Sequence, residues 1–181
     1  MSLRSSAARY GSLAQGLHWL TALLIVCLFI AGNVMDDLAA GQKLTVYRAH
    51  AAGGITVLVL TLVRLIWRFM DRDRPELPAG MSGRMRFAAR AAHWLIYLLM
   101  LAITGSGIAT LIVSGLGEIL FMGADRPIPD RIGVLPRDAH ELFATLLMWL
   151  LFLHVAAALY HHYFRKDDVL RRMMPRGSRG R

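Results

Sequence analysis

Four long apolar stretches constrain this chain more than any other feature of its sequence. They cover about residues 17–35, 50–70, 93–113 and 141–163. Each is long enough to cross a bilayer, which takes about 20 residues of helix. Apolar residues make up 56% of the 181 residues and charged residues 18%, against about 45–50% and 25% in soluble domains. The sequence therefore predicts an all-α transmembrane four-helix bundle.

Lysine and arginine are distributed unevenly between the two sides of such a bundle. With the N-terminus in the cytoplasm, sixteen of the 21 basic residues lie inside and five outside, and cytoplasmic loops carry the excess of positive charge. Both termini are therefore expected in the cytoplasm. The formal charge of +9 is then explained by membrane topology, without a nucleic-acid partner. Arg64 and Arg68, near one end of the second stretch, are expected to extend toward the lipid headgroups.

The longer outer connection, residues 114–139, contains a short apolar run, Ile119-Leu120-Phe121-Met122. An apolar run of this length between two spans is expected to lie along the membrane surface. The alternative is that it covers a site beneath it.

Seven histidines carry most of the chemistry, because ionisable residues at membrane depth are costly and usually mark function. His140 and His154 are 14 residues apart, which is close to four helical turns and about 21 Å of rise. They therefore share one face of a helix at two depths. His161 continues the same face toward the cytoplasm, whereas His162 is turned away from it.

Depth sorts the remaining histidines into two levels. His50 and His140 are the two on the outer side. On the inner side His18 and His154 form a pair, with His93 as a competitor. Two histidines from different helices at each of two levels suit two haem irons stacked across the bilayer. The chain has no CxxCH motif, so the haem would be of the b type.

Two competing interpretations of the histidines remain. A lone histidine at a membrane interface is usually a headgroup or helix-end contact, and this is the simplest interpretation of His93 and His162. The other is a haem-free membrane module that moves or senses a metal ion through the row of histidines. A structural zinc site would need four ligands at one depth, and no span contains an HxxxH pair supported by a carboxylate or thiolate.

Several segments resemble the small bacterial cytochrome b561 proteins, which are four-helix, di-haem membrane cytochromes linked to quinone. The resembling segments are His18-Trp19-Leu20, His50 to Gly54 leading to Val63-Arg64-Leu65, His93 to Leu99, His140-Glu141, Leu153 to Asp167, and Leu170 to Pro175. The resemblance covers nearly the whole chain. It implies that residues 1–181 form a single integral-membrane cytochrome b domain in the bacterial inner membrane.

The resemblance also implies roles for particular residues. In proteins like this, the positions matching His18 and His154 hold the inner haem and those matching His50 and His140 hold the outer haem, which favours His18 over His93. One member of the family resembles a superoxide oxidase, which passes electrons from periplasmic superoxide to membrane ubiquinone. His161 matches a histidine associated with the quinone pocket. The implied cofactors are therefore two haem b and ubiquinone, with His161 as the catalytic candidate.

The outer charges depart from what a superoxide oxidase needs. A positive surface would steer an anionic radical, yet seven carboxylates outnumber the five outer cations and give a net formal charge of −2. Folding could still gather the cations into a local basic patch. The alternative is a quinone-linked cytochrome b subunit that serves a periplasmic redox partner, since an acidic face suits a basic protein. The outer cations are Lys43, Arg48, Arg126, Arg131 and Arg137, and the carboxylates are Asp36, Asp37, Glu118, Asp125, Asp130, Asp138 and Glu141.

Overall fold

Helices account for all the regular secondary structure that is described. A computed structural model of the chain describes residues 2–78, 80–129 and 132–175, and these ranges contain no strand. The long helices are α1 (Ser12–Val34), α2 (Ala40–Met70), α3 (Gly83–Val113) and α5 (Leu135–Tyr163). The short elements are η1 (Met35–Asp37), α4 (Leu116–Phe121) and α6 (Val169–Met173). The predicted all-α fold is therefore confirmed.

All four predicted spans are helices long and apolar enough to cross a membrane. The helices end where the apolar stretches end but begin five to ten residues earlier. A helix satisfies its own backbone hydrogen bonds whether its side chains are apolar or polar, so its first turns can extend beyond the apolar region. Ser82, for example, lies eleven residues before His93 and caps α3 by accepting a hydrogen bond from the backbone N–H of Met85.

The surface of the bundle is apolar, as a lipid-facing surface must be. Large hydrophobic side chains such as Val59, Trp149 and Phe152 are 54–66% exposed along the middle of the long helices. The buried core is small and has two parts. One lies in the middle of the bundle, at Val57, Leu99, Met100 and Leu147. The other lies near α4, at Met35, Tyr47, Leu116, Ile119 and Leu120.

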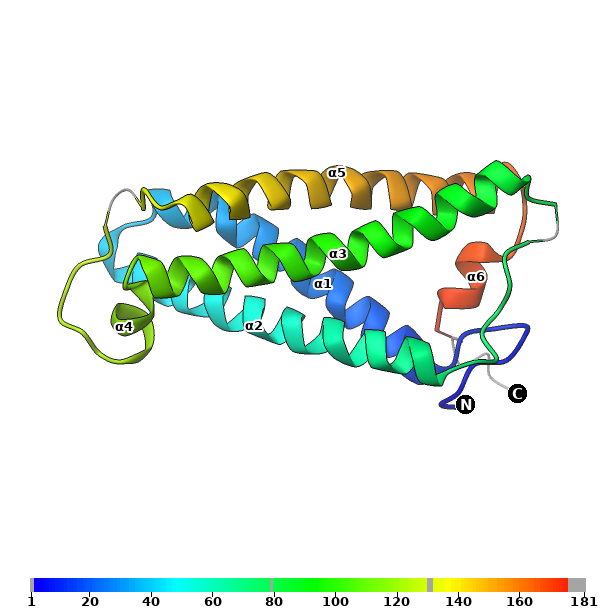
Figure 1. Ribbon diagram of the computed structural model, residues 1–181, viewed down its shortest axis with the longest axis horizontal. Helices are drawn as coiled ribbons and strands as arrows, with labels where there is room; N and C mark the ends of the chain where they lie inside the picture. Colours follow the sequence, from blue (N-terminus) through cyan, green and yellow to red (C-terminus); the bar gives the residue numbers. More distant parts are fainter. Residues whose placement is uncertain (1, 79, 130–131, 176–181) are drawn as a thin grey trace.

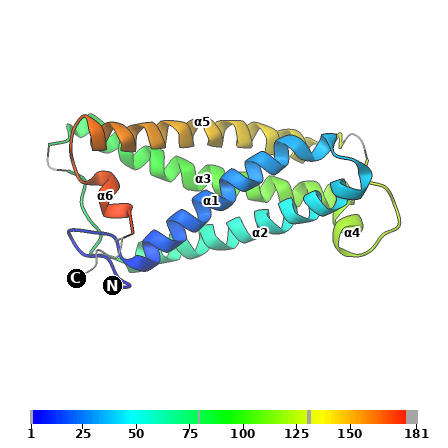
Figure 2. The ribbon, with the colours of Figure 1, turned by 180° about the vertical axis from the view of Figure 1, so that it is seen from behind.

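The bundle has two distinct ends. Figure 1 shows α4 and its loop at one end, which we call the loop end, and α6 at the other, where the described chain also begins and ends, which we call the terminal end. Neighbouring helices pack in the order α1 on α2, α2 on α3 and α3 on α5, whereas α1 and α5 make no comparable contact. Helix α1 crosses the others obliquely (Figure 2). Five residues used in the charge counts lie outside the described residues: Asp130, Arg131, Arg176, Arg179 and Arg181.

Segments far apart in the sequence join at the terminal end to form what we call the terminal cap, made of residues 2–10, 71–78 and 80–82 together with α6. The indole N–H of Trp19 donates to the carbonyl oxygen of Met173 at 3.0 Å. The side-chain amide of Gln15 donates to the carbonyl oxygen of Arg172 at 3.2 Å. The backbone N–H of Ser5 donates to the buried carboxylate of Asp71. The cap therefore ties both chain ends to the bundle.

The apolar run at 119–122 covers a site, rather than only lying on the membrane surface. It forms the end of α4, which begins after Gly115 in the left-handed conformation, with φ of 72°, a region that glycine adopts at little cost. Leu116 and Leu120 are buried and line the pocket described below, while Phe121 and Met122 are exposed. The structure therefore supports the alternative interpretation, in which this run covers a site beneath it.

Candidate functional site: two histidine pairs inside the bundle

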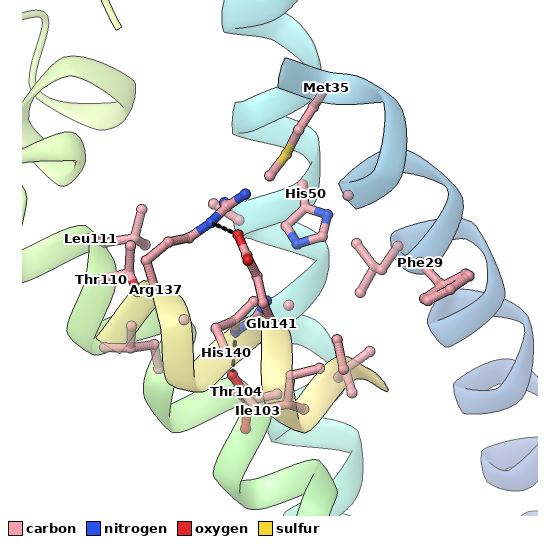
Figure 3. Close-up of a pocket in the computed structure, with 18 of the residues that line it drawn as sticks. Phe29, Met35, His50, Ile103, Thr104, Thr110, Leu111, Arg137, His140 and Glu141 are labelled. Carbon is pink, nitrogen blue, oxygen red and sulfur yellow. Dashed lines mark hydrogen bonds and ion pairs between the residues drawn. The ribbon is translucent and has the colours of Figure 1, made fainter. Parts of the chain in front are cut away.

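The first histidine pair lies near the loop end. His50 from α2 and His140 from α5 approach each other with ring centres 6.2 Å apart, and both line one pocket (Figure 3). Nδ1 of His140 lies 2.8 Å from the carbonyl oxygen of Ile103. Because that oxygen only accepts, Nδ1 carries the proton and Nε2 keeps a free lone pair. Nδ1 of His50 is buried and makes no hydrogen bond within the described part of the chain, although it approaches the backbone of Leu28.

The pocket around this pair has a volume of about 470 Å³, within the range of about 300–1,000 Å³ that is usual for ligand and cofactor sites. Two glycines bring helix backbones close to the histidine rings. A Cβ atom on Gly32 would lie 3.2 Å from Cε1 of His50, and one on Gly107 would lie 3.1 Å from Cε1 of His140. Carbon atoms normally pack about 3.5–4.0 Å apart, so a larger residue at either position would press on a histidine ring.

A network of ion pairs connects four of the residues that line the pocket. Arg137 lies with Nη2 3.1 Å from Oδ2 of Asp36 and with Nε 2.7 Å from Oε1 of Glu141. The Tyr47 hydroxyl also donates to Asp36. Figure 3 shows Arg137 and Glu141 beside His140. Sequence reasoning missed this network: the spacing of four between Arg137 and Glu141 is a recognisable signal, whereas Asp36 is 101 residues away from Arg137.

Two other outer arginines are also held by acceptors. Arg126 pairs with Glu118 at 2.6 Å, and Nε of Arg48 donates to the carbonyl oxygen of Leu120 at 2.6 Å. Arg131 lies outside the described residues. Arg126 and Arg137 are therefore each paired with a carboxylate. Arg48 is held by a carbonyl oxygen instead. These three do not form the free basic patch considered from the sequence.

The second histidine cluster lies nearer the terminal end, where His18 from α1 and His93 from α3 both approach His154 from α5. The ring centres of His18 and His154 are 6.4 Å apart, and those of His93 and His154 are 5.3 Å apart. Nδ1 of His93 donates to the carbonyl oxygen of Ala89, one turn earlier in its own helix, at 2.6 Å. The structure thus brings together His154 and both histidines that the sequence left in competition for it.

Arg64 does not extend toward the headgroups, so that expectation was wrong. Its Nη2 lies 3.1 Å from Nδ1 of His18, and its Cζ lies 5.6 Å from the centre of the Tyr97 ring. An imidazole lone pair and an aromatic face inside the bundle offer the guanidinium partners that hydropathy does not reveal. Arg68, one turn further along α2, lies 5.3 Å over the ring of Trp94.

His161 and His162 differ in their surroundings, as their helical spacing predicts. His161 is only 8% exposed, and its Nδ1 lies 2.5 Å from Oδ2 of Asp167. The other oxygen of Asp167 accepts a hydrogen bond from the backbone N–H of Val169 at 3.2 Å, which holds the carboxylate in place. His162 is less buried and contacts the ring of Tyr163, with centres 4.9 Å apart. Sequence analysis did not identify Asp167 as a partner of His161.

The histidines inside the bundle form one facing pair near the loop end and, nearer the terminal end, His154 with two neighbours. Within the described ranges, no three His, Cys, Asp or Glu side chains are grouped so that they could hold a metal ion, whereas a structural zinc site takes four ligands. Two facing imidazoles suit a metal whose other ligands come from a macrocycle, as in haem proteins. The chemistry and spacing of the donors, together with the pocket beside the first pair, therefore fit haem.

Comparison with known proteins gives a family for the chain. Residues 9–176 match the model of the prokaryotic cytochrome b561 family. A probable superoxide oxidase from Yersinia pestis is 31% identical over 172 residues, covering 93% of this chain and 97% of that protein. Cytochrome b561 homolog 1 from Escherichia coli K12 is 33% identical, covering 88% and 93% of the two chains. Cytochrome b562 from Cereibacter sphaeroides is 31% identical, covering 91% and 94%. With a family model that spans nearly its whole length and relatives of matching size, the chain belongs to the prokaryotic cytochrome b561 family.

Proposed function

We propose that this protein carries electrons across the membrane between two haem b groups, from superoxide on the periplasmic side to ubiquinone. Membership of the family implies a haem b membrane protein with an electron-transfer function. His50 and His140 would hold one haem near the loop end, and His18 and His154 would hold the other nearer the terminal end. The single observation that carries this proposal is the presence of two histidine pairs at two levels of one bundle.

The ring separations support this pairing. Two imidazoles that bind one metal ion from opposite sides have ring centres about 6.3 Å apart, since the metal–nitrogen bond is about 2.0–2.1 Å long and the nitrogen lies about 1.1 Å from the ring centre. The separations of 6.2 Å for His50 and His140 and 6.4 Å for His18 and His154 agree with this value. The separation of 5.3 Å between His93 and His154 is too short, which favours His18.

The chemistry of the proposed reaction balances. Two superoxide ions each give up one electron and leave as dioxygen, and one ubiquinone takes up the two electrons with two protons to form ubiquinol. Haem b, when bound, would supply a one-electron carrier, and the two histidines of each pair would hold it. The protein orients the histidine rings: the Ile103 carbonyl holds the proton of His140 on Nδ1, so that Nε2 could bind a metal.

His161 is the proposed proton-donating residue at the quinone end. It lies seven residues beyond His154 on α5, which is about 10 Å of rise toward the terminal end. Asp167 accepts a hydrogen bond from its Nδ1, which directs the other ring nitrogen, Nε2, away from the carboxylate. A histidine held in this way can donate to a quinone oxygen through Nε2 when that nitrogen also carries a proton, because the Asp167 carboxylate accepts from Nδ1 and stabilises the doubly protonated ring.

The side of the membrane at which each end lies is also part of the proposal. The basic residues that the positive-inside bias assigns to the cytoplasm flank the terminal end, and they include Arg72, Arg74, Arg165, Arg171 and Arg172. The loop end would therefore face the periplasm of a bacterial inner membrane, so that electrons enter there and leave toward the cytoplasmic side.

A second candidate function is favoured by the charges at the loop end. Arg137 and Arg126 are paired with carboxylates, so these cations offer less attraction to an anionic donor than free ones would. An acidic surface instead suits a basic periplasmic redox protein. In that case the chain would be a quinone-linked cytochrome b subunit. Copurification of a redox protein in fixed ratio would favour this candidate.

One experiment tests the proposed function directly. The visible spectrum of the purified protein should show two haem b per chain, whereas a haem-free metal module would show none. Addition of superoxide under anaerobic conditions should reduce both haems, and addition of ubiquinone should then reoxidise them. A protein with two haems that quinol reduces but superoxide does not would refute superoxide as donor and favour the subunit alternative.

A further inference from the structure

Arg64 is a charged side chain without a charged partner inside the bundle. It lies six residues before the end of α2, a helix able to span the membrane. No carboxylate in the described ranges pairs with it. Its contacts are the imidazole of His18 and the ring of Tyr97. A charge at this depth is costly unless it is paired, so the site is suited to an anion.

The contact between Arg64 and His18 is incompatible with a metal bound to His18. A guanidinium has only hydrogen-bond donors, so Nδ1 of His18, 3.1 Å from Nη2 of Arg64, accepts, and the proton lies on Nε2. When one nitrogen of a neutral imidazole binds a metal, the other must carry the proton. If Nε2 binds the metal, Nδ1 carries the proton and faces Arg64 as a second donor. If Nδ1 binds it, the lone pair that accepts from Arg64 is occupied by the metal. Arg64 must therefore turn to another acceptor.

The loop-end pair shows the contrast. Nδ1 of His140 already donates to the Ile103 carbonyl, so that Nε2 is free for a metal without any change in hydrogen bonding. His18 reaches that state only if Arg64 releases it. Binding at the terminal-end pair therefore requires an acceptor for Arg64 within reach of His18.

We propose that Arg64 binds a propionate carboxylate of the haem held by His18 and His154. This inference rests on the terminal-end haem of the proposed function. Haem b carries two propionates, and the planar guanidinium matches a carboxylate through two parallel hydrogen bonds. When His18 binds the metal it no longer accepts a hydrogen bond from Arg64. The propionate of the same haem would then supply the acceptor that Arg64 needs.

Trp67 offers a second donor on the same part of α2. It lies three residues after Arg64, which places the two side chains next to each other on the helix surface. Its indole Nε1 is buried and has no hydrogen-bond acceptor among the described residues. Buried indole N–H groups normally have a partner. Two neighbouring donors suit a carboxylate, which has two oxygens.

The test is a redox titration of the full-length holoprotein with Arg64→Gln, Arg64→Lys and the control Arg68→Gln, which removes the same charge one turn away. A cation beside a propionate stabilises the reduced haem. Arg64→Gln should therefore lower the reduced-to-oxidised ratio of one haem about tenfold at fixed ambient potential, a shift of about 59 mV. Arg64→Lys should retain the haem with a smaller shift, and Arg68→Gln should change the ratio less than threefold.

The same proteins loaded with haem b dimethyl ester, which has no free carboxylate, identify the anion. If Arg64 binds a propionate, wild type and Arg64→Gln should differ less than twofold with the ester. A full tenfold difference with the ester would overturn the proposal, and would point to a lipid phosphate or to a direct effect through His18. Equal loss of haem from Arg64→Lys and Arg64→Gln would also overturn it, because lysine can pair with a carboxylate, as arginine does, whereas glutamine carries no charge.

These outcomes are separable from those of the proposed function. Fewer than two haems in the wild-type protein would refute the di-haem function itself. Two haems, with potentials that Arg64→Gln leaves unchanged within twofold, would refute only the propionate contact. His154→Ala identifies the haem concerned, because the band that it removes should be the one whose titration Arg64→Gln shifts.

Discussion

Gly107 lies against the ring of His140, and its replacement by alanine tests how closely α3 must approach the proposed haem ligands at the loop end. The added Cβ would lie 3.1 Å from Cε1 and 3.2 Å from Nδ1 of that ring, several tenths of an ångström closer than the usual contact of about 3.5–4.0 Å. Crowding of this kind costs about 1–3 kcal/mol, whereas alanine in a helix interior gains about 0.5–1 kcal/mol over glycine. The difference is about 0–2.5 kcal/mol, and we expect a net loss near its middle, about 1.3 kcal/mol, or about tenfold in an equilibrium constant.

Gly105 provides the matched control for this prediction. It lies two residues away on the same helix, it is exposed, and a Cβ there would meet nothing within 4 Å. Gly105→Ala should therefore retain haem as well as the wild type, or better. The assay is the transfer of haem from each purified variant to apomyoglobin, together with the haem content per chain. Equal retention by Gly107→Ala and Gly105→Ala would refute the argument that His140 and α3 are packed at their limit.

Three further predictions concern the ligands, the orientation and the quinone end. His50→Ala or His140→Ala should remove one haem from the visible spectrum and leave the other, because the two levels are separated by about 21 Å along α5; loss of both haems with intact helix content would contradict the pairing. A reporter fused after Arg181, which lies outside the described residues, should report the cytoplasm, and a periplasmic signal would reverse the orientation. His161→Ala should keep both haems and their reduction but slow reoxidation by ubiquinone about 10²-fold, the usual contribution of a proton donor. His162→Ala, in stopped-flow measurements under the same conditions, should have a much smaller effect, and equal rates for the two variants would remove His161 from the quinone site.

The fold was predictable because the membrane leaves few alternatives. Hydropathy identified all four spans, since a backbone in lipid must satisfy its own hydrogen bonds. The approach of His50 to His140 followed from depth alone, because each lies in the loop-end part of its helix and α2 and α5 run in the same direction. The starts of the helices were less predictable, since the turns before His50 and His93 continue into polar sequence without a change in backbone conformation.

The remaining parts of the site depend on tertiary contacts that leave no local pattern. The contact of Arg137 with Asp36 joins residues 101 positions apart. Arg64 looked like an interfacial residue because it lies near the end of an apolar stretch. The sequence does not show that the imidazole of His18, on another helix, lies within hydrogen-bond distance of it. His18 and His93 both lie near His154, at ring separations that differ by about 1 Å, and helical periodicity does not specify the position of a side chain this closely.

The terminal cap has a consequence for biosynthesis. In this cap the side chains of Gln15 and Trp19 donate hydrogen bonds to the carbonyl oxygens of Arg172 and Met173, which are among the last described residues to be synthesised. A chain made from its N-terminus can therefore complete all four long helices before this end of the bundle closes. During that interval the terminal-end histidines are reachable without opening a finished structure, so the order of synthesis itself provides a time for cofactor insertion.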